Sequence, residues 1–462
     1  MRAFTGLLCL AVLTLPVLIP PAPTLAADAA GVAGEPDDGL VLGWYVSGMG
    51  GMINREWAFG ADAFLDLSVK GFRMTVGAPL RFHAHGFRMQ YWDEVADFGR
   101  LVREVSYTRP KDRLSIAIAP VSGFGLGVGN LVSRFNSTVD ADHWRTGFTG
   151  SWDSAYGGVA MFMDSVLAPE VAGGRIYVRP FQAIHPGGFV GRMEIGGTLV
   201  ADFKAPARYR RVGRKIALGN ADLPLVERRH VMGAGLDVRW PVYQSDSAEV
   251  VPYFAMSMVG SGSGLHTGLA LDIRAIKAVR FGLAAEWRYL GPGYVAPYFD
   301  SLYMVDRWDF SSSDPYNAKT KARMLDDVLD TRMGAMAAVF VKAKDLLMAW
   351  VRLDWDAKGE YSQLGIGADI NVLDLVGIRL NLAQRGFTSF KGLFHPNRLV
   401  FAGAVDVNVL KNVSIFGVYS RDVSIRTAGT DLGLYRPTDG FQIGVRVGFQ
   451  YQKDAGKSGN KN

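Results

Sequence analysis

The most regular feature of the chain is a long-range alternation of apolar and polar residues. Between positions 189 and 203 the odd positions are apolar or glycine, and the even positions include Arg192, Glu194 and Asp202. Successive side chains of a β-strand point to opposite faces, so this stretch predicts a strand with one apolar face and one charged face. The same pattern recurs along most of the chain.

Many of these stretches run to 10–14 residues, whereas strands in soluble proteins usually have about five or six. A membrane-spanning barrel requires tilted strands of about 9–11 residues, apolar outside and polar inside. In a bilayer only helices and closed barrels pair every backbone group. We therefore predict an all-β transmembrane antiparallel barrel of about 18 strands (16–20, an even number), with one or two short helices in loops or lumen. The alternative is a large secreted soluble β protein.

The predicted strands form a series of 19 stretches, one more than an even barrel of 18 strands allows. The weakest is 124–133, whose glycines equally suit a packed inner segment. The stretches are 39–48, 57–68, 72–82, 113–119, 124–133, 157–164, 174–184, 189–203, 229–240, 249–259, 265–274, 279–290, 332–342, 346–356, 361–372, 375–385, 398–410, 412–422 and 438–452.

Aromatic residues stand at the ends of many predicted strands. Aromatic girdles at the two membrane surfaces would explain this placement. Ordinary β-propensity of aromatic residues is the alternative explanation. The residues are Trp57, Phe82, Phe203, Trp240, Trp287, Tyr289, Trp350, Trp355, Phe449 and Tyr451.

The N-terminus has the pattern of an export signal. Arg2 precedes an apolar run, and small residues at Thr24 and Ala26 predict a signal peptide over 1–26, followed by a linker over 27–38. A membrane anchor is the alternative. The single cysteine, Cys9, lies inside the apolar run, so the mature chain would have no cysteine, as suits an oxidising compartment.

Composition excludes several other classes of protein. The 462 residues include 50 Lys and Arg against 44 Asp and Glu, and 49% are hydrophobic. This balance argues against a disordered chain, and a nearly balanced charge gives no indication of nucleic-acid binding. One cysteine cannot form an internal disulfide. After the N-terminus, no apolar stretch is long enough for a spanning helix.

The signal peptide, the cysteine-free mature chain, the amphipathic strands and the aromatic strand 440–451 together resemble the porin-like class of Gram-negative outer-membrane β-barrels. The resemblance covers 39–452 and points to no particular family within the class. It implies a location in the outer membrane, contact with the lipid bilayer and lipopolysaccharide, and insertion by the barrel-assembly machinery. The polar tail 453–462 departs from the class, whose last strand usually ends on an aromatic residue. Many porins are trimers, but the pattern does not decide whether this chain forms a homo-oligomer.

Three segments interrupt the strand pattern. In 91–107, apolar residues recur every three or four positions and predict an amphipathic helix. This helix would act as a constriction or plug, or else pack against one rim. Segment 120–156 is rich in Gly, Asp and aromatic residues. Its Asp140 and Asp142 lack the glycine and distal glutamate of a calcium loop.

The longest interruption is 291–331, with a short helix expected over 319–329. Loops of this length are usually functional, and in outer-membrane barrels they lie outside the cell or fold into the lumen. Its acidic residues suggest a constriction loop. The candidates are Asp300, Asp306, Asp309 and Asp314.

Basic residues gather in one connection and along the polar faces of the strands. Rings of Arg and Lys in a pore favour anions. The alternatives are a solvated or lipopolysaccharide-binding loop, and strand arginines that pair internally with Asp202, Asp237, Asp354 and Asp406. The loop candidates are Lys204, Arg208, Arg210, Arg211, Arg214 and Lys215, and the pore-lining candidates are Arg73, Arg192, Arg239, Arg280, Arg288, Arg352, Arg379 and Arg446.

The sequence gives little support for a catalytic site. The chain has no Gly-x-Ser-x-Gly nucleophile elbow. His83 and His85 share a strand face, but no third metal ligand is identifiable. His266 lies just inside a strand that follows a Gly-Ser turn. We therefore predict neither an enzyme nor a cofactor.

The sequence supports three functions in decreasing order. The first is a channel for passive or selective passage of small polar, especially anionic, solutes. The second is a plugged, non-conducting barrel that binds partners at its surface. The third is an outer-membrane enzyme that hydrolyses lipid or peptide, which would need a convergent Ser/His/Asp or metal cluster near the lipid face or outer mouth. Fold alone does not decide among them.

Overall fold

The computed structural model describes residues 40–53, 56–138, 144–212, 215–217, 225–276, 278–308, 319–344, 346–359, 361–373, 375–387, 392, 399–410, 412–425 and 435–453. The predicted signal peptide and linker lie outside these ranges, as does the predicted tail beyond Lys453.

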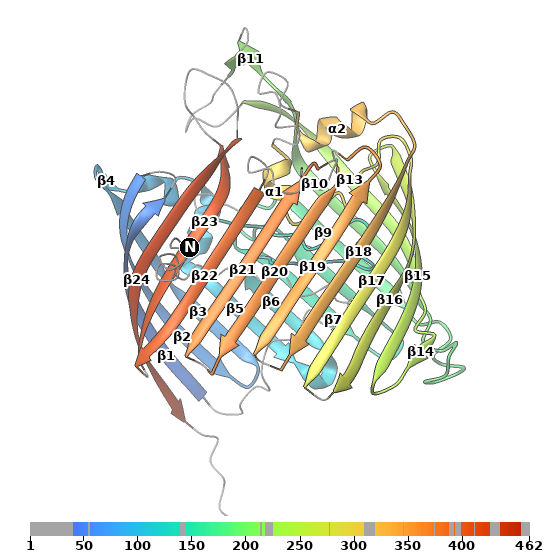
Figure 1. The fold of residues 1–462 in the computed structure, drawn as a ribbon, viewed down its shortest axis with the longest axis horizontal. Helices are drawn as coiled ribbons and strands as arrows, with labels where there is room; N and C mark the ends of the chain where they lie inside the picture. Colours follow the sequence, from blue (N-terminus) through green and yellow to red (C-terminus); the bar gives the residue numbers. More distant parts are fainter. Residues whose placement is uncertain are drawn as a thin grey trace, which may run out of the picture.

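Twenty strands close into one antiparallel barrel (Figure 1). The first strand pairs with the second and also with the last, where Leu40 stands opposite Lys453. The predicted all-β closed barrel is therefore confirmed, and the strand number is corrected from about 18 to 20. The wall strands are β1 (Leu40–Ile53), β2 (Glu56–Val69), β3 (Phe72–His83), β5 (Val102–Arg109), β6 (Leu114–Ala119), β7 (Gly147–Asp153), β8 (Gly157–Met163), β9 (Val171–Val178), β10 (Glu194–Tyr209), β13 (Val226–Arg239), β15 (Ala248–Val259), β16 (Gly262–Ile276), β17 (Val279–Leu290), β18 (Arg332–Ala343), β19 (Leu347–Asp356), β20 (Gln363–Val372), β21 (Val376–Arg385), β22 (Leu399–Leu410), β23 (Val413–Ile425) and β24 (Tyr435–Lys453).

The remaining elements are short. None of the helices in the described ranges is long and apolar enough to cross a bilayer. The expected helix over 319–329 is present as α2. The short elements are β4 (Gly86–Phe87), β11 (Arg211–Val212), β12 (Lys215–Ile216), β14 (Tyr243–Gln244), η1 (Met89–Tyr91), η2 (Val95–Leu101), η3 (Pro110–Asp112), α1 (Tyr303–Asp306) and α2 (Lys321–Asp327).

All but one of the 19 predicted stretches overlap a wall strand. The exception, 124–133, is an inner segment, and the strands missed are β5 and β7. β7 is short and contains two glycines, so its alternation is weak. The strand predicted over 189–203 instead begins at Glu194 and continues to Tyr209. Arg192 consequently lies in a turn rather than on a strand.

The predicted helix over 91–107 is wrong. The short 3-10 helix η2, begun by reciprocal capping between Glu94 and Asp97, ends at Leu101. The chain then becomes β5, which pairs with β3 through Met74 and Val105. Pairing with the neighbouring strands satisfies the backbone groups along their edges. A helix at this position in the wall would leave those edge groups unpaired. The helical spacing of apolar residues therefore did not determine the structure.

The two ends of the barrel differ in their connections. At the lower end of Figure 1, β1 begins, β24 ends, and connections such as 70–71 and 154–156 are short; we call this the turn end. Lys70 and Gly71 both have positive φ (46° and 81°), as a tight two-residue hairpin turn requires. The opposite end carries α1, α2, β11 and the connections 120–146 and 291–331; we call this the loop end. In outer-membrane barrels the short turns face the periplasm and the long loops face outside.

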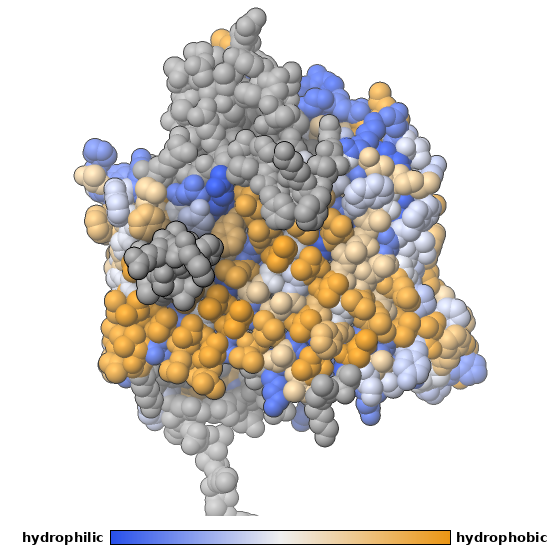
Figure 2. Space-filling model, in the orientation of Figure 1, coloured by the Kyte–Doolittle hydropathy of each residue, from blue (hydrophilic) through white to orange (hydrophobic). Residues whose placement is uncertain are grey.

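The outer face of the wall is apolar. In β24, Ile443, Val445, Val447 and Phe449 are exposed, while Gly444, Arg446 and Gly448 between them face inward. Figure 2 shows apolar residues gathered in a band across the visible wall, with polar residues towards the ends. Outward aromatic residues stand near both ends, as Trp57 packs on Phe441 near the loop end and Trp44 on Phe449 near the turn end. Trp350, by contrast, is buried.

Candidate functional site

One side of the lumen is filled by two inner segments. Segments 120–138 and 291–308 lie against each other, because Ser133 N donates to Phe299 O and Phe299 N donates to Leu131 O. Their apolar side chains form one core with wall residues of β8, β10, β13, β15 and β17. Fully buried members are Leu131, Val132, Phe135, Tyr298, Phe299 and Tyr303. This side, from β8 to β19, is a packed interior rather than a water-filled pore, and we call it the filled side.

An ion-pair network fastens the 291–331 loop to the wall. Arg307 donates to Asp202 (3.0 Å) and also contacts Glu170 (2.5 Å). The Tyr303 hydroxyl donates to Asp202 Oδ2 (2.7 Å). Arg307 is 1% exposed, so this network is shielded from solvent. Burial alone would raise the pKa of Glu170, but the guanidinium groups of Arg307 and Arg145 hold it below its usual range.

A second anchor joins the same loop to β15 and β16. The Tyr294 hydroxyl contacts both the Ser257 hydroxyl and His266 Nε2, the latter at 3.1 Å. Ser257 Oγ lies 3.3 Å from His266 Nε2, and His266 Nδ1 lies 3.0 Å from Glu286. This is the order of groups in a Ser–His–carboxylate triad. All of these side chains are buried, and the Ser257 hydroxyl is already in contact with the hydroxyl of Tyr294.

The predicted acidic residues of the 291–331 loop do not form an exposed ring. Asp300 pairs with Lys321 at 2.6 Å, and Asp306 pairs with Arg385 on β21. Both aspartates are buried. They therefore hold the loop against the helix α2 and the wall. Asp309 and Asp314 lie outside the described residues.

Most of the predicted pore-lining arginines are paired within the wall. Five of the eight contact a carboxylate, as the alternative of internal pairing expects, although only Asp354 and Asp406 of the four named aspartates serve them. Asp202 and Asp237 instead pair with Arg307 and Arg175. The pairs are Arg239 with Glu194 (3.5 Å), Arg280 with Asp272 (2.9 Å), Arg288 with Glu286 and Asp354 (2.7 Å to the latter), Arg352 with Asp354 (2.7 Å) and Arg446 with Asp406 (3.4 Å).

The other three arginines differ in position. Arg73 is exposed on the inward face of β3, and Arg379 is half-buried on β21, near Asp369. Arg192 is at the turn end, where its Nε donates to Gly187 O. The structure therefore does not bring the eight arginines together as one ring.

The predicted basic loop lies at the loop end. Lys204 and Arg208 are exposed on the last part of β10, and Arg210 is exposed just after it. Lys204 Nζ is 4.0 Å from Glu170. Contact of this group with lipopolysaccharide stays a prediction. Arg211 belongs to β11 and Lys215 to β12, while Arg214 is outside the described residues.

The segment before β5 turns inward at the loop end and carries an aromatic and arginine cluster. The Tyr91 ring is buried, and the guanidinium groups of Arg81, Arg88 and Arg100 lie 4.3–5.8 Å from its centroid. Arg81 also pairs with Asp62 at 2.6 Å. The chain is not the predicted long helix, and its Tyr91 packs against Ile53 and Ala58 at the loop end of β1 and β2.

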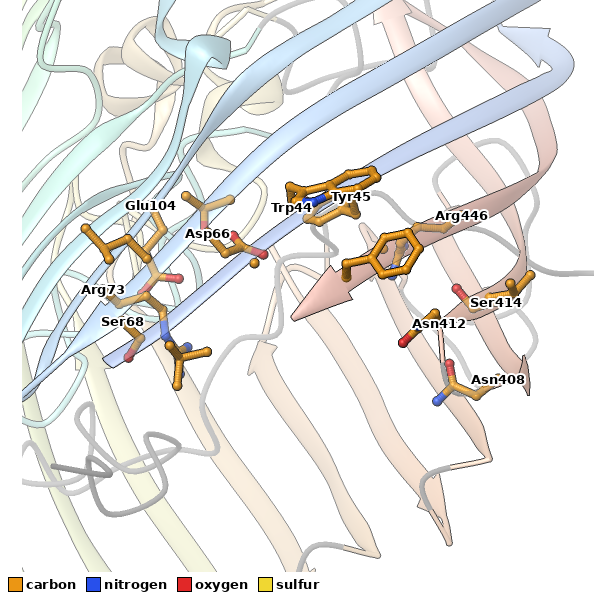
Figure 3. A pocket seen from close by; sticks show the side chains of 17 residues that line it. Trp44, Tyr45, Asp66, Ser68, Arg73, Glu104, Asn408, Asn412, Ser414 and Arg446 are labelled. Carbon is orange, nitrogen blue, oxygen red and sulfur yellow. The ribbon is translucent and has the colours of Figure 1, made fainter. Parts of the chain in front are cut away.

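The opposite side of the lumen is open near the turn end. A cavity of about 650 Å³ lies between β1, β2, β3, β5, β23 and β24. Figure 3 shows Asp66, Arg73 and Glu104 on one flank of this cavity and Arg446 with Ser414 on the other. Asp66, Thr75 and Glu104 stand opposite one another across three adjacent strands. The cavity thus presents two arginines, two carboxylates and several hydroxyl and amide groups.

The inward residues of the wall beside this cavity are also less buried than those of the filled side. On β21 and β22 the inward residues Arg379, Asn381 and Asp406 are only half-buried. On β15–β17 the inward residues Ser257, His266 and Arg288 are at most 1% exposed. We call the sector from β20 through β24 to β3 the open side. Polar solutes can lie against its hydrogen-bonding groups, whereas the described part of the filled side is packed with apolar side chains.

The residues that fill the lumen were not predicted from the sequence. Tyr294 and Arg307 gave no signal, because their partners lie far away in the chain, and Trp350 was assigned to an aromatic girdle although it is buried in the lumen. The only available signal was the length of 291–331 together with the glycine-rich 120–138, which suited an inner segment. The candidate metal residues also stay apart: His83 and His85 face each other across 5.7 Å between ring centroids, but no group of three His, Cys, Asp or Glu in the described residues could hold a metal. Asp140 and Asp142 are outside those residues.

Comparison with known proteins gives low similarities. No family model matches the chain, and no curated protein does. Among solved structures, the ferric enterobactin receptor PfeA of Pseudomonas aeruginosa has a TM-score of 0.37 at 8% identity, with 88% of this chain and 80% of that one covered. P. aeruginosa OccK5 has a TM-score of 0.33 at 9% identity (91% and 100% covered). Wzi, a carbohydrate-binding outer-membrane β-barrel involved in capsule assembly in Escherichia coli, has 0.33 at 11% (90% and 85%). Scores this low carry no argument about activity.

The architecture itself places the chain in a membrane. A closed sheet has no unpaired edge, and its outer band is apolar, which are the two conditions for strands to cross a bilayer. The long connections at one end and short turns at the other complete the pattern of the class. The described strands therefore form a closed β-barrel of the membrane-spanning type, the architecture that the alternation of apolar and polar residues predicted.

Proposed function

We propose that this barrel lets small polar solutes pass along the open side of its lumen. The observation that supports the proposal is the asymmetry of the interior, with a cavity of about 650 Å³ on one side and a solid core on the other. Solutes would move by diffusion along hydroxyl, amide and charged groups that replace part of their hydration. The filled side would fix the width of the path.

The expected preference for anions is weak. The cavity carries Arg73 and Arg446 against Asp66 and Glu104, and Arg446 is already paired with Asp406. Arg73 is the cavity arginine that has no carboxylate partner within the described residues. We therefore assign any anion preference chiefly to Arg73, with Arg379 contributing further along the wall.

Single-cysteine accessibility tests the path, because the chain's one cysteine lies in the predicted signal peptide. Ser68→Cys and Thr75→Cys would place a thiol in the cavity, and Ser257→Cys would place one on the filled side. We expect a charged thiol reagent to reduce the single-channel current of the first two variants and leave the third unchanged. A folded, inserted protein without conductance would contradict the channel and favour the plugged barrel.

Ion preference is tested separately, by reversal potential in a salt gradient. Arg73→Glu should shift the preference towards cations, because the added carboxylate joins Asp66 and Glu104. Arg192→Glu is the matched control: it makes the same charge change at the same end but away from the cavity. Equal shifts in both variants would mean that the cavity does not select ions.

A second function, hydrolysis by Ser257, is favoured by one observation: the Ser257–His266–Glu286 arrangement at the loop end. Ser257 would attack an acyl carbonyl while His266 takes its proton and returns it to the leaving group, and a water molecule deprotonated by His266 would then release the acyl group as an acid and restore the Ser257 hydroxyl. Such an activity needs Tyr294 to move away from Ser257. Labelling by a fluorophosphonate probe, with Ser257→Ala as control, tests it in the native chain and in Tyr294→Ala. No labelling of Ser257 in either chain would remove this candidate.

A further inference from the structure

Arg134 is a buried cation on the inner segment 120–138. Its side chain lies against the Trp350 ring on the inward face of β19. The residue is 7% exposed, and its Nε has no hydrogen-bond partner. Among the residues that the structure describes, no carboxylate pairs with it. Burial and the neighbouring Arg352 hold the pKa of the Arg134 guanidinium well below its usual range.

The carboxylates near Arg134 are already engaged. Asp354 accepts from Arg288 at 2.7 Å, and from Arg352 at 2.7 and 2.9 Å. Glu286 accepts from Arg288, Tyr253 and His266. This cluster therefore holds three guanidinium groups and two carboxylates, which leaves one positive charge in excess.

Charges bordering the cluster do not correct this excess. Asp300 is bonded to the buried ammonium of Lys321 at 2.6 Å. An ionised group without a counter-charge is expensive to bury. Arginine keeps its proton in proteins even where burial lowers its pKa, because that pKa starts above 12 in water, so deprotonation does not remove the cost. The cation over the Trp350 ring gains some stabilisation from the ring, but the ring supplies no charge.

A small cavity lies beside the unpaired cation. Its volume is about 10 Å³, and its lining includes Ser133, Ser301, the cations Arg134 and Arg352, and the already paired carboxylates Asp300 and Asp354. That size corresponds to about one water-sized occupant. A carboxylate, phosphate or sulfate group is too large for it. Ser301 accepts from Gln363 Nε2 at 2.9 Å, so its own hydroxyl proton is free to be donated into the cavity.

We propose that a single chloride-sized anion occupies this cavity, held by Arg134, Arg352 and the hydroxyl of Ser301. One monovalent anion would balance the excess charge of the cluster, which a water molecule cannot do. The site joins the inner segment 120–138 to β19 and β20, at the boundary between the filled and open sides. The bound anion would therefore keep the inner segment on its side of the lumen. This inference does not depend on whether the barrel conducts.

The direct test is anomalous scattering from crystals of the native protein soaked in sodium bromide. We expect a bromide peak between Arg134 and Arg352. A well-ordered Arg134 with no peak beside it would overturn the proposal, and so would density there that is explained by water. This experiment needs no variant, so it stands even if substitutions prevent folding.

A second test uses thermal unfolding at constant ionic strength, with chloride replaced stepwise by gluconate, which is too large for the cavity. The native protein should unfold about 2 °C or more higher in chloride. Arg134→Met should lose this dependence and be no less stable than the native protein in gluconate, because it removes an unpaired charge. Arg113→Met, an exposed arginine at the turn end, should keep the dependence. An equal chloride effect in the native protein and Arg134→Met would overturn the proposal.

Discussion

The strands β15–β17 and the strands β21–β23 have the same alternation of outward apolar and inward polar residues, but their inward faces meet different surroundings. Ser257, His266 and Arg288 are almost completely buried under the inner segments. Arg379, Asn381 and Asp406 on the other strands are only half-buried. The polar face of a barrel strand is therefore not by itself a pore lining. It becomes a lining only where no inner segment packs on it.

The two sides also use charge differently. On the filled side, buried arginines are shared between carboxylates and hydroxyl groups, so the network holds the loop to the wall. On the open side, Arg73, Asp66 and Glu104 stand near one another at a cavity wide enough for solutes. The same residue types thus stabilise one half of the lumen and are available to solutes in the other.

The largest effect should come from removing an inner segment. β6 and β7 are neighbours, with Ala119 opposite Gly147, so a short Gly-Ser turn can replace 120–146 without breaking the wall. We expect single-channel conductance to rise severalfold, because the filled side would open. Replacing 180–192 at the turn end, between the paired strands β9 and β10, is the control. If both variants conduct like the native protein, the inner segment does not limit the path.

Next in size is the loss of the Arg307 network. Arg307→Met leaves Asp202 and Glu170 without their shared cation in a buried site, which should lower the free energy of unfolding by about 3–5 kcal/mol. Arg113→Met removes an exposed pair with Asp153 and should cost at most about 1 kcal/mol. Urea unfolding in detergent micelles measures both. Similar losses would mean that the Arg307 network is no more protected than a surface pair.

A smaller effect is expected at Tyr294. Tyr294→Phe removes the hydroxyl that contacts Ser257 and His266 but keeps the ring, so it should lower the free energy of unfolding by about 1–2 kcal/mol. Tyr156→Phe, an exposed tyrosine, is the control and should be nearly neutral. If Tyr294→Phe leaves the free energy of unfolding unchanged, apolar packing alone holds the loop.

The smallest expected effect is a pH dependence of the free energy of unfolding, which arises in the segment above the open side. Burial, only partly offset by Arg100, raises the pKa of Asp97 to about 6, above the value near 4 expected in the unfolded chain. The folded state then binds the proton more tightly, so this group's contribution to stability falls as pH rises from about 4 to 6 and is constant above. Its size should be about 1 kcal/mol after allowance for solvent screening. The fall of the free energy of unfolding with rising pH should disappear in Asp97→Asn and persist in Asp93→Asn, an exposed control. If this fall persists in both variants, it belongs to another titrating group.

Part of this structure was readable from the sequence. Period-two alternation located all but two of the wall strands, because a strand in a barrel wall must present one face to lipid and the other to the lumen. It failed at β7, where glycines weaken the pattern, and at β5, where helical spacing overlapped the strand. The candidate arginines were placed on the correct strand faces except Arg192, but their partners depended on contacts between distant residues.

The sequence by itself determined the closed barrel, its apolar outer face and all but two of the wall strands, since all three follow from local periodicity. Only the tertiary structure decided that 120–138 and 291–308 pack on each other through Phe299, and that Arg307 and Tyr294 bind carboxylates and hydroxyls on strands far away in the chain. These contacts join positions separated by 100 residues or more in several cases, such as Tyr303 with Asp202. No local pattern carries that information, because pairing across a lumen depends on where closure of the whole sheet brings each side chain.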